Sequence, residues 1–218
     1  MGVSLRLDDL GKRFRYEWIY KGLTTEIKAG ERVALLGPNG SGKSTLMKTL
    51  SGQLTPSRGR LSYTAGGSPL PTDRIYRHLS YAAPYIELIE EFTLREAIDF
   101  HRQFKPLLTG LDTAALIELL DFGRSRNKEV RNFSSGMKQR LKLALACCTD
   151  SDLLLLDEPT TNLDAQGVRW YRALIERFGG ERTIVVASNV AVDYEFCERR
   201  LAILDYKPAP RRRKRRVA

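Results

Sequence analysis

The alternation of apolar and polar residues predicts that the chain begins with strands. Residues 3–10 alternate with a period of two, which is typical of a strand with one buried face. Further short apolar or alternating runs are also of strand length: residues 18–20, 23–27, 32–36, 59–64 and 79–82. Because the first runs lie close together, we expect a small antiparallel sheet that leads into the strand at 32–36.

Three helical patterns then follow one another without a strand between them. Thr93 and Glu96 match a capping box, in which a hydroxyl and a carboxylate satisfy the first free N–H groups of a helix. Asp112 is a capping residue for a helix over 113–122, and apolar residues recur at helical spacing over 137–148. We therefore predict a helical subdomain inserted into a strand-and-helix pattern.

After this insertion, strands and helices alternate again to the end of the pattern. The predicted strands cover residues 153–156, 183–187 and 201–204, and a helix covers 168–178. This alternation is typical of a mostly parallel sheet covered by helices. The predicted fold is therefore α/β, with a mostly parallel sheet, an N-terminal antiparallel β subdomain and the inserted helical subdomain. The predicted core comprises residues 1–84 and 150–207, and the helical subdomain about 85–149.

A phosphate-binding pattern follows the strand at 32–36 directly. Residues 37–45 fit G-x-x-x-x-G-K-[ST], and the glycines let backbone N–H groups close around a polyphosphate. The helix that begins near Gly42 points its positive end at the same charge. We expect Lys43 to contact the β- and γ-phosphates and Ser44 to bind Mg²⁺. The pattern predicts a nucleotide site formed by Gly37, Pro38, Asn39, Gly40, Ser41, Gly42, Lys43, Ser44 and Thr45.

Two carboxylates form a second candidate group of site residues. Asp157 and Glu158 follow the apolar run 153–156, and a buried parallel strand carries its last residues to the sheet edge where the phosphate loop also lies. We expect Asp157 to bind Mg²⁺ and Glu158 to accept a proton from the water that attacks the γ-phosphate. By itself this pair is equally consistent with an exposed strand end, but the phosphate loop favours a site.

Composition changes this picture little. The chain has 218 residues, of which 42% are hydrophobic, as in ordinary soluble proteins. No apolar run is long enough to cross a bilayer, and the N-terminus lacks the features of a secretory signal, so we expect a cytoplasmic protein. Cys147, Cys148 and Cys197 have no partners at metal-ligand spacing, and we expect buried reduced thiols.

The positive charge is concentrated at the C-terminal end. The net charge is +10, and the six basic residues of 211–216 account for more than half of it. We interpret residues 208–218 as a disordered, solvated tail that begins at Pro208, and residues 1–207 as the folded domain. Contact of the tail with anionic lipid headgroups or with RNA is an alternative interpretation.

Taken together, these motifs resemble the ATP-binding subunits of ABC transporters. The resemblance covers nearly the whole chain and rests on the order of four segments: residues 37–45, 132–140, 157–158 and 161–164. It implies a P-loop NTPase that binds ATP and Mg²⁺, hydrolyses ATP, and forms a homodimer or pseudo-symmetric dimer of ATP-binding subunits. It also implies separate transmembrane permease subunits, which would hold the chain on the cytoplasmic face of the membrane.

The resemblance assigns further residues to the nucleotide site. Ser134 and Gly136 match the signature segment that meets the γ-phosphate held by the other subunit of the dimer. Asp164 matches the aspartate of a loop that reaches across the dimer. Phe14 lies where the family has an aromatic ring that stacks on adenine, and Tyr16 is a second candidate; a core aromatic is the alternative for both.

Two positions depart from the family pattern. Pro84 falls where a glutamine usually binds Mg²⁺ and senses the membrane partner, and Asn189 falls where a histidine usually contacts the γ-phosphate. An asparagine amide can donate a hydrogen bond to phosphate, but it cannot carry a positive charge. Because Glu158 is retained, we still predict hydrolysis with Glu158, Lys43 and Asn189 as the catalytic residues; it should be slow if the histidine acts as a charge.

Family resemblance also places the docking groove for the membrane partner around residues 84–92. An apolar cluster lies there, for which burial in the core is the alternative: Tyr85, Ile86, Leu88, Ile89 and Phe92.

Two other functions compete with a transport ATPase. A soluble ABC ATPase acting on RNA or ribosomes would use the tail as an RNA-binding arm, but such relatives usually carry two phosphate loops or a long coiled coil. This chain has one such loop and no sustained heptads, so nucleic acid is the less favoured partner. A regulatory subunit that binds nucleotide without hydrolysing it is supported only by Pro84 and Asn189.

Overall fold

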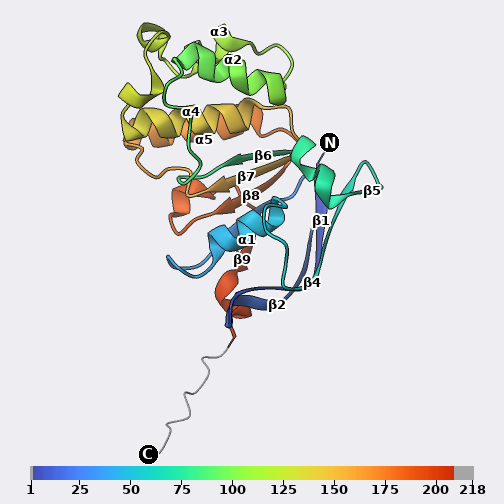
Figure 1. Ribbon diagram of the computed structural model, residues 1–218. Coiled ribbons are helices and arrows are strands. Elements are labelled where there is room, and N and C mark those ends of the chain that lie inside the picture. The colour runs from blue at the N-terminus through green and yellow to red at the C-terminus, as the bar shows by residue number, and fades with distance from the viewer. Residues whose placement is uncertain (1, 209–218) are drawn as a thin grey trace, which may run out of the picture.

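Two sheets and a set of helices make up the protein, for which a computed structural model describes residues 2–208 (Figure 1). The first sheet is antiparallel with strand order β2-β1-β4-β5. Its strands are β1 (Val3–Phe14), β2 (Glu17–Ile27), β4 (Arg58–Ala65) and β5 (Ser68–Leu70). The predicted N-terminal β subdomain is thus confirmed, although the runs at 18–20 and 23–27 belong to one strand. The pairing of β1 with β2 contains register shifts, which explains why the alternation of buried and less buried residues along β1 is interrupted.

The second sheet is parallel and has strand order β6-β7-β8-β3-β9. Its strands are β3 (Arg32–Leu36), β6 (Leu79–Ala82), β7 (Leu153–Asp157), β8 (Thr183–Ala187) and β9 (Arg199–Ala202). Every residue of β7 and β8 is buried, as expected for central strands covered on both faces. The predicted strand 201–204 is shifted, because a short 3-10 turn begins at Ile203.

Two hydrophobic cores lie on opposite faces of the parallel sheet. Leu153 and Leu155 of β7 pack with α1 (Lys43–Leu50) and the antiparallel sheet, whereas Leu154 and Leu156 pack with α4 (Ser135–Cys148) and α5 (Ala165–Phe178). This division follows from the alternation of side chains along a strand. Figure 1 shows α4 and α5 on the sheet face opposite α1, with α2 (Leu94–Phe104) and α3 (Thr113–Leu119) beyond them.

The helix starts follow the capping residues of the sequence. The capping box of Thr93 and Glu96 is complete at the start of α2, and the Asp112 carboxylate accepts a hydrogen bond from the N–H of Ala115. The predicted end of α3 at 122 is wrong, because Asp121 adopts a left-handed φ of 57° that breaks the helix. α4 and α5 begin earlier than predicted, since Ser134 and Asp164 cap them.

Some predictions concern thiols, membrane spans and the C-terminal tail. The three cysteines are free; Cys147 and Cys148 are buried and Cys197 partly so, and burial raises the pKa of each thiol to about 12. No helix among residues 2–208 has the length and apolar character needed to span a membrane. All of the predicted basic tail except Pro208 lies outside the described residues.

A partly buried histidine gives the fold a pH dependence. The His101 ring donates from Nε2 to Thr149 Oγ1 at 2.8 Å, because that hydroxyl already donates to the Leu145 carbonyl. Burial, with a smaller effect from Lys105, lowers the pKa of His101 to about 4. In the unfolded chain the group titrates near its ordinary value of about 6.5, so its neutral form contributes stability that is lost as the pH falls from about 6.5 towards 4.

We therefore expect acidification to destabilise the wild type more than a variant without this imidazole. Between pH 7 and pH 5 the wild type should lose about 2 kcal/mol of unfolding free energy on account of His101. His101→Gln, which keeps a donor for Thr149, should lack this part of the pH dependence. Urea denaturation of both proteins at the two pH values measures the difference. Equal losses of unfolding free energy in the two proteins would show that folding does not lower the pKa of His101.

Candidate functional site

The phosphate loop joins β3 to α1 at the carboxyl edge of the parallel sheet (Figure 1). Gly37, Gly40 and Gly42 have φ values of 154°, 74° and 109°, which residues with a side chain rarely adopt. A Cβ atom on Gly42 would lie 2.4 Å from Cγ2 of Ile19, and one on Gly37 would lie 2.7 Å from Cγ2 of Ile203. The loop thus packs against the side chains of Ile19 and Ile203, and its backbone N–H groups can face a polyphosphate.

Replacement of Gly42 by alanine should displace this loop. The new methyl group would collide with Ile19 and strain a left-handed residue, so we expect ATP affinity to fall by at least about tenfold. Gly66→Ala is the matched control, because Gly66 is also left-handed, with φ of 56°, but has open space around its Cα. Titration with a fluorescent ATP analogue compares the two variants; equal affinities would mean that the close contact with Ile19 is unimportant.

The Lys43 ammonium group is buried above the loop among oxygen atoms. The residue is only 4% exposed, and Nζ donates to the Gly37 carbonyl at 2.6 Å and to Asn189 Oδ1 at 3.1 Å. The Asn189 amide in turn donates to Asn39 Oδ1 at 2.8 Å. Asn189 therefore connects Lys43 to the tip of the loop. An entering phosphate oxygen can replace the Gly37 and Asn189 oxygens as the acceptor of the Lys43 ammonium.

Asp157 ends β7 next to the loop and carries a buried carboxylate. Oδ2 accepts a hydrogen bond from the Tyr85 hydroxyl at 3.1 Å, whereas Oδ1 is buried without a hydrogen-bond partner among the described residues. Burial raises the pKa of Asp157, and the hydroxyls of Ser44 and Tyr85 partly offset this by favouring the carboxylate. A buried oxygen without a partner next to a serine hydroxyl fits Mg²⁺, which prefers hard oxygen ligands.

Glu158 follows Asp157 and turns the chain sharply away from β7. Its φ is 46°, which is uncommon for a residue other than glycine, and its N–H donates to the Ala187 carbonyl at 2.8 Å. Unlike Asp157, which is buried, Glu158 is only partly buried. The two carboxylates thus have different environments, one suited to a cation and the other to a proton from water.

The carboxyl ends of three neighbouring strands bring these groups together. Leu35 of β3 and Asp157 of β7 both pair in register with Ala187 of β8, so the loop, Asp157 and Asn189 extend from the same level of the sheet. Ligands of open α/β sheets commonly bind at this edge. The arrangement is suited to binding a nucleoside polyphosphate and to attack by water on its terminal phosphate.

Three residues assigned by resemblance lie at the starts of other helices. The Ser134 hydroxyl accepts from the N–H of Met137 and caps α4, and the Asp164 carboxylate accepts from the N–H of Gly167 and caps α5. A Cβ on Gly136 would lie 3.0 Å from the Asn162 carbonyl oxygen, so the start of α4 is close to the segment before α5. Among residues 2–208, no hydrogen bond joins these caps to the phosphate loop.

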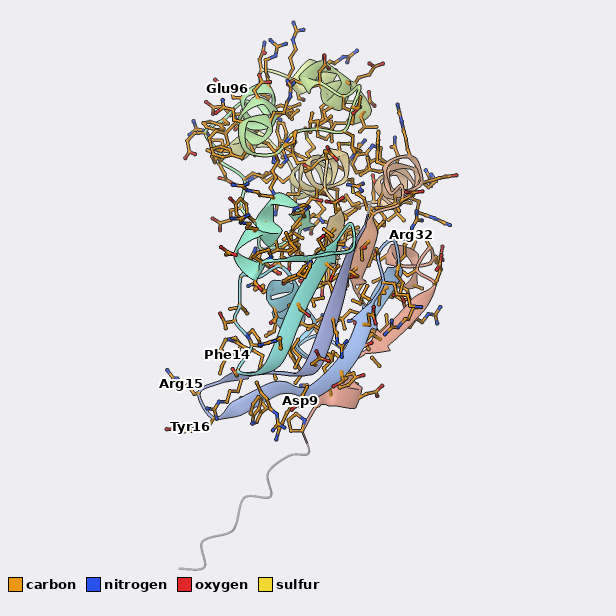
Figure 2. The ribbon with its side chains drawn as sticks, turned by 90° about the vertical axis from the view of Figure 1, so that its right-hand side faces the viewer. Asp9, Phe14, Arg15, Tyr16, Arg32 and Glu96 are labelled. Carbon is orange, nitrogen blue, oxygen red and sulfur yellow. The ribbon has the colours of Figure 1, made fainter. Side chains whose placement is uncertain are left out.

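The candidate adenine-stacking ring lies on the antiparallel sheet. Figure 2 shows Phe14, Arg15 and Tyr16 at one end of β1 and β2. Phe14 is 46% exposed and Tyr16 is 90% exposed, so the alternative that either is a core aromatic is wrong. The Lys12 ammonium lies 5.3 Å from the centre of the Phe14 ring.

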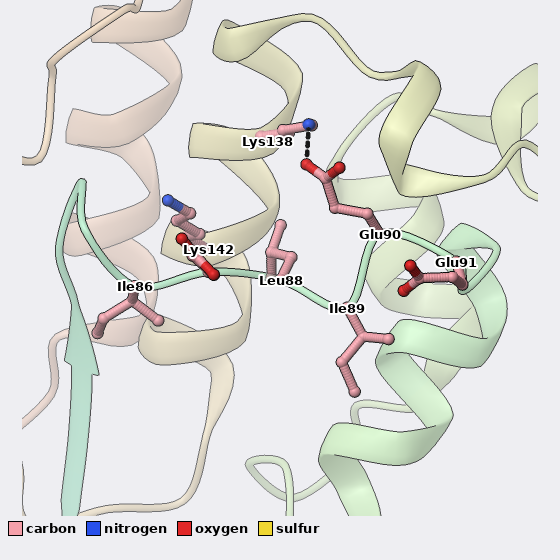
Figure 3. A pocket seen from close by; sticks show the side chains of 8 residues that line it. Ile86, Leu88, Ile89, Glu90, Glu91, Lys138 and Lys142 are labelled. Atoms are coloured by element: carbon pink, nitrogen blue, oxygen red, sulfur yellow. Dashed lines mark hydrogen bonds and ion pairs between the residues drawn. The ribbon is translucent and has the colours of Figure 1, made fainter.

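The predicted docking segment lines a groove against α4. Residues 86–91 form one wall, with Lys138 and Lys142 of α4 on the other, around a volume of about 530 Å³ (Figure 3). Lys138 Nζ pairs with Glu90 Oε1 at 2.5 Å, and Ile89 is 41% exposed. Of the apolar cluster, Leu88 and Phe92 are partly buried against the hydrophobic core, as the alternative has it, whereas Tyr85 and Ile89 are exposed.

Comparison with known proteins decides the family. Residues 20–161 match the family model described as ABC transporter, which is more than half of the chain. The chain belongs to this family. The ABC resemblance and the α/β P-loop fold are thus confirmed, and ATP binding is the property that the family shares.

Curated relatives of this ABC chain include the Nod factor export ATP-binding protein I of two bacteria. That of Rhizobium meliloti (strain 1021) is 34% identical over 212 residues, which cover 93% of this chain and 62% of the relative. That of Burkholderia orbicola (strain AU 1054) is 33% identical over 203 residues, which cover 89% and 65%. The chain thus spans less than two thirds of the length of these relatives.

Solved structures agree with the fold. A structure titled as the ATP-binding subunit of an ABC transporter is 26% identical, has a TM-score of 0.77, and covers 91% of this chain and 85% of that one. A dimeric post-hydrolysis ATP-binding cassette bound to ADP and Pi is 23% identical, has a TM-score of 0.78, and covers 91% and 94%. At this identity, the second likeness shows the fold alone.

The sequence does not predict the contacts of Tyr85 and Asp193 at the ABC site. The Tyr85 hydroxyl donates a hydrogen bond to Asp157. The preceding residue, Pro84, stands where the family has a glutamine, and its carbonyl accepts a hydrogen bond from Lys142 Nζ at 2.8 Å. Asp193 accepts from Thr160 Oγ1 at 2.5 Å and also binds the Ser188 hydroxyl. Neither tyrosine nor aspartate lies in a recognisable motif, so only the tertiary structure brings them to the site.

Proposed function

We propose that the chain is the ATP-hydrolysing subunit of an ABC exporter. The observation that carries this proposal is the meeting of Lys43, Asp157 and Glu158 at one sheet edge. The Lys43 ammonium is buried there, and a buried Asp157 oxygen has no hydrogen-bond partner within the described part of the chain. Membership of the ABC family supports ATP binding, and the names of the Nod factor export relatives support export.

In this proposal each part of the site has a separate task. Lys43 and the N–H groups of the phosphate loop bind the β- and γ-phosphates, and the Asn189 amide donates to the terminal phosphate. Ser44 and Asp157 would hold Mg²⁺, which neutralises phosphate charge when bound. Glu158 orients the attacking water and takes its proton.

We also propose that two chains form the complete site. Ser134, Gly136 and Asp164 lie at helix starts that, within the described residues, form no hydrogen bond with the phosphate loop of their own chain, so they are available to a nucleotide held by a second subunit. The dimeric ATP-binding cassette among the structural neighbours supports this arrangement. Phe14 is the proposed adenine contact.

The remaining proposal concerns the membrane partner and the organisation of the chain. The groove of residues 86–91 would receive a segment of separate membrane-spanning subunits, which would place the chain at the cytoplasmic face of the membrane. The proposed domains are a core of residues 1–84 and 150–207 and a helical subdomain of about 85–149, which contains the whole lining of this groove. The family and the export relatives support a membrane partner.

Membrane recovery tests the transport part of this function. We expect wild type produced in its native cells to sediment with membranes, and Ile89→Asp to lose most of this association while still binding ATP. Leu204→Asp is the matched control, since Leu204 is an aliphatic residue of similar exposure, 48%, outside the groove. Equal recovery of the two variants would contradict docking at the groove.

A further inference from the structure

Tyr85 makes an unusual contact with the proposed metal-binding carboxylate. Its hydroxyl donates to Asp157 Oδ2 at 3.1 Å and also contacts the hydroxyl of Tyr81. A phenol has one proton, so if Tyr85 donates to the carboxylate, Tyr81 must donate to Tyr85. The two hydroxyls therefore form a chain of hydrogen bonds that ends on Asp157.

The ring of Tyr85 is fixed from two sides. It meets the Tyr81 ring edge to face, with centroids 6.3 Å apart and an interplanar angle of 81°. The Lys48 ammonium lies 4.1 Å from the centre of the Tyr85 ring. Lys48 is four residues after Ser44 on α1, hence on the same face of the helix, so the ring connects the phosphate-loop helix to β7.

The backbone around Tyr85 is held as well. Ile86 N–H donates to the Ala83 carbonyl at 3.2 Å and closes a turn, and the Pro84 carbonyl accepts from Lys142 of α4. Contacts with the ring, the hydroxyl and the main chain thus hold Tyr85, although the residue is 41% exposed. Such restriction is what a group needs if it is to orient another side chain.

We propose that Tyr85 is the positioning residue of the metal site, whose hydroxyl fixes Asp157 so that the free Oδ1 binds a nucleotide-bound divalent cation. This inference rests on the proposed function, because it requires that Asp157 holds the cation of a bound nucleotide. Its basis is the difference between the two carboxylate oxygens: Oδ2 has a partner, and Oδ1 is buried with no hydrogen-bond partner among residues 2–208. Hydrogen bonds of this kind orient metal ligands, and their removal typically weakens metal binding by about 10- to 100-fold.

The test is the metal affinity of Tyr85→Phe, which removes the hydroxyl and keeps the ring. Mn²⁺ is titrated, with electron paramagnetic resonance as the readout, into protein saturated with a non-hydrolysable ATP analogue. We expect Tyr85→Phe to need about tenfold more Mn²⁺ than wild type. Affinity for the same analogue in EDTA should be unchanged, because the phosphate loop itself is untouched.

Tyr76→Phe is the matched control, because Tyr76 is an exposed tyrosine whose hydroxyl accepts from Arg77. It should titrate like wild type. A Tyr85→Phe variant that also titrates like wild type overturns the inference, and so does one that loses nucleotide affinity equally with and without metal, since that is a purely structural effect. If wild type itself binds no nucleotide, the proposed function fails, and this inference fails with it.

Discussion

Replacement of Glu158 by glutamine is expected to slow phosphate release from MgATP by at least about 100-fold while ATP binding is retained. Glutamine has almost the same shape, but its amide cannot accept the proton of the attacking water. Glu158 is suited to this task because it is partly exposed and follows the buried Asp157 through a left-handed turn. A coupled assay of phosphate release and titration with a fluorescent ATP analogue give the two quantities.

The same variant should accumulate as an ATP-bound dimer, because the nucleotide between the two subunits is no longer consumed. Size-exclusion chromatography with light scattering, on the samples used for the turnover assay, measures this. Glu181→Gln is the matched control, since Glu181 is exposed and the substitution makes the same change of charge. Turnover of the Glu158 variant within twofold of this control would exclude Glu158 as the base.

Replacement of Lys43 by alanine is expected to weaken ATP binding by about 100-fold. The Lys43 ammonium is buried among oxygen atoms, and each charge-assisted hydrogen bond that it transfers to a phosphate is worth about 1.5–3 kcal/mol. Loss of two such bonds corresponds to a factor of about 100 or more in affinity. The fluorescent ATP analogue again provides the measurement.

A matched control separates this effect from a loss of charge in general. Lys28→Ala removes one positive charge from an exposed residue in the connection between β2 and β3 and should bind ATP like wild type. Denaturation of both variants checks that each is folded. An affinity of Lys43→Ala close to that of Lys28→Ala would contradict phosphate binding by Lys43.

The features that sequence predicts best depend on local order. Strand β3, the glycines of the phosphate loop and helix α1 are consecutive, so one pattern specifies their geometry. β7 is predictable for a related reason, because its run of leucines indicates a strand buried on both faces whatever its neighbours are. The capping box at Thr93 likewise specifies where α2 begins.

The features that sequence misses depend on contacts between distant segments. Tyr85 meets Asp157 from 72 positions away, and Lys43 meets Asn189 from 146 positions away. No spacing rule predicts either contact, because each arises only when the strands of the parallel sheet are placed side by side. The shortened α3 was missed for another reason, since the left-handed conformation of Asp121 ends it without a glycine.

Steady-state phosphate release by the wild-type chain, as a function of MgATP and of protein concentration, tests the central claim most directly. The account predicts saturable turnover whose specific rate rises with protein concentration, because two chains complete each site. Lys43→Ala sets the background. Phosphate release no greater than this background, at concentrations where the wild type binds ATP and with membranes of its native cells supplied, would contradict hydrolysis and leave nucleotide binding as the function of the chain.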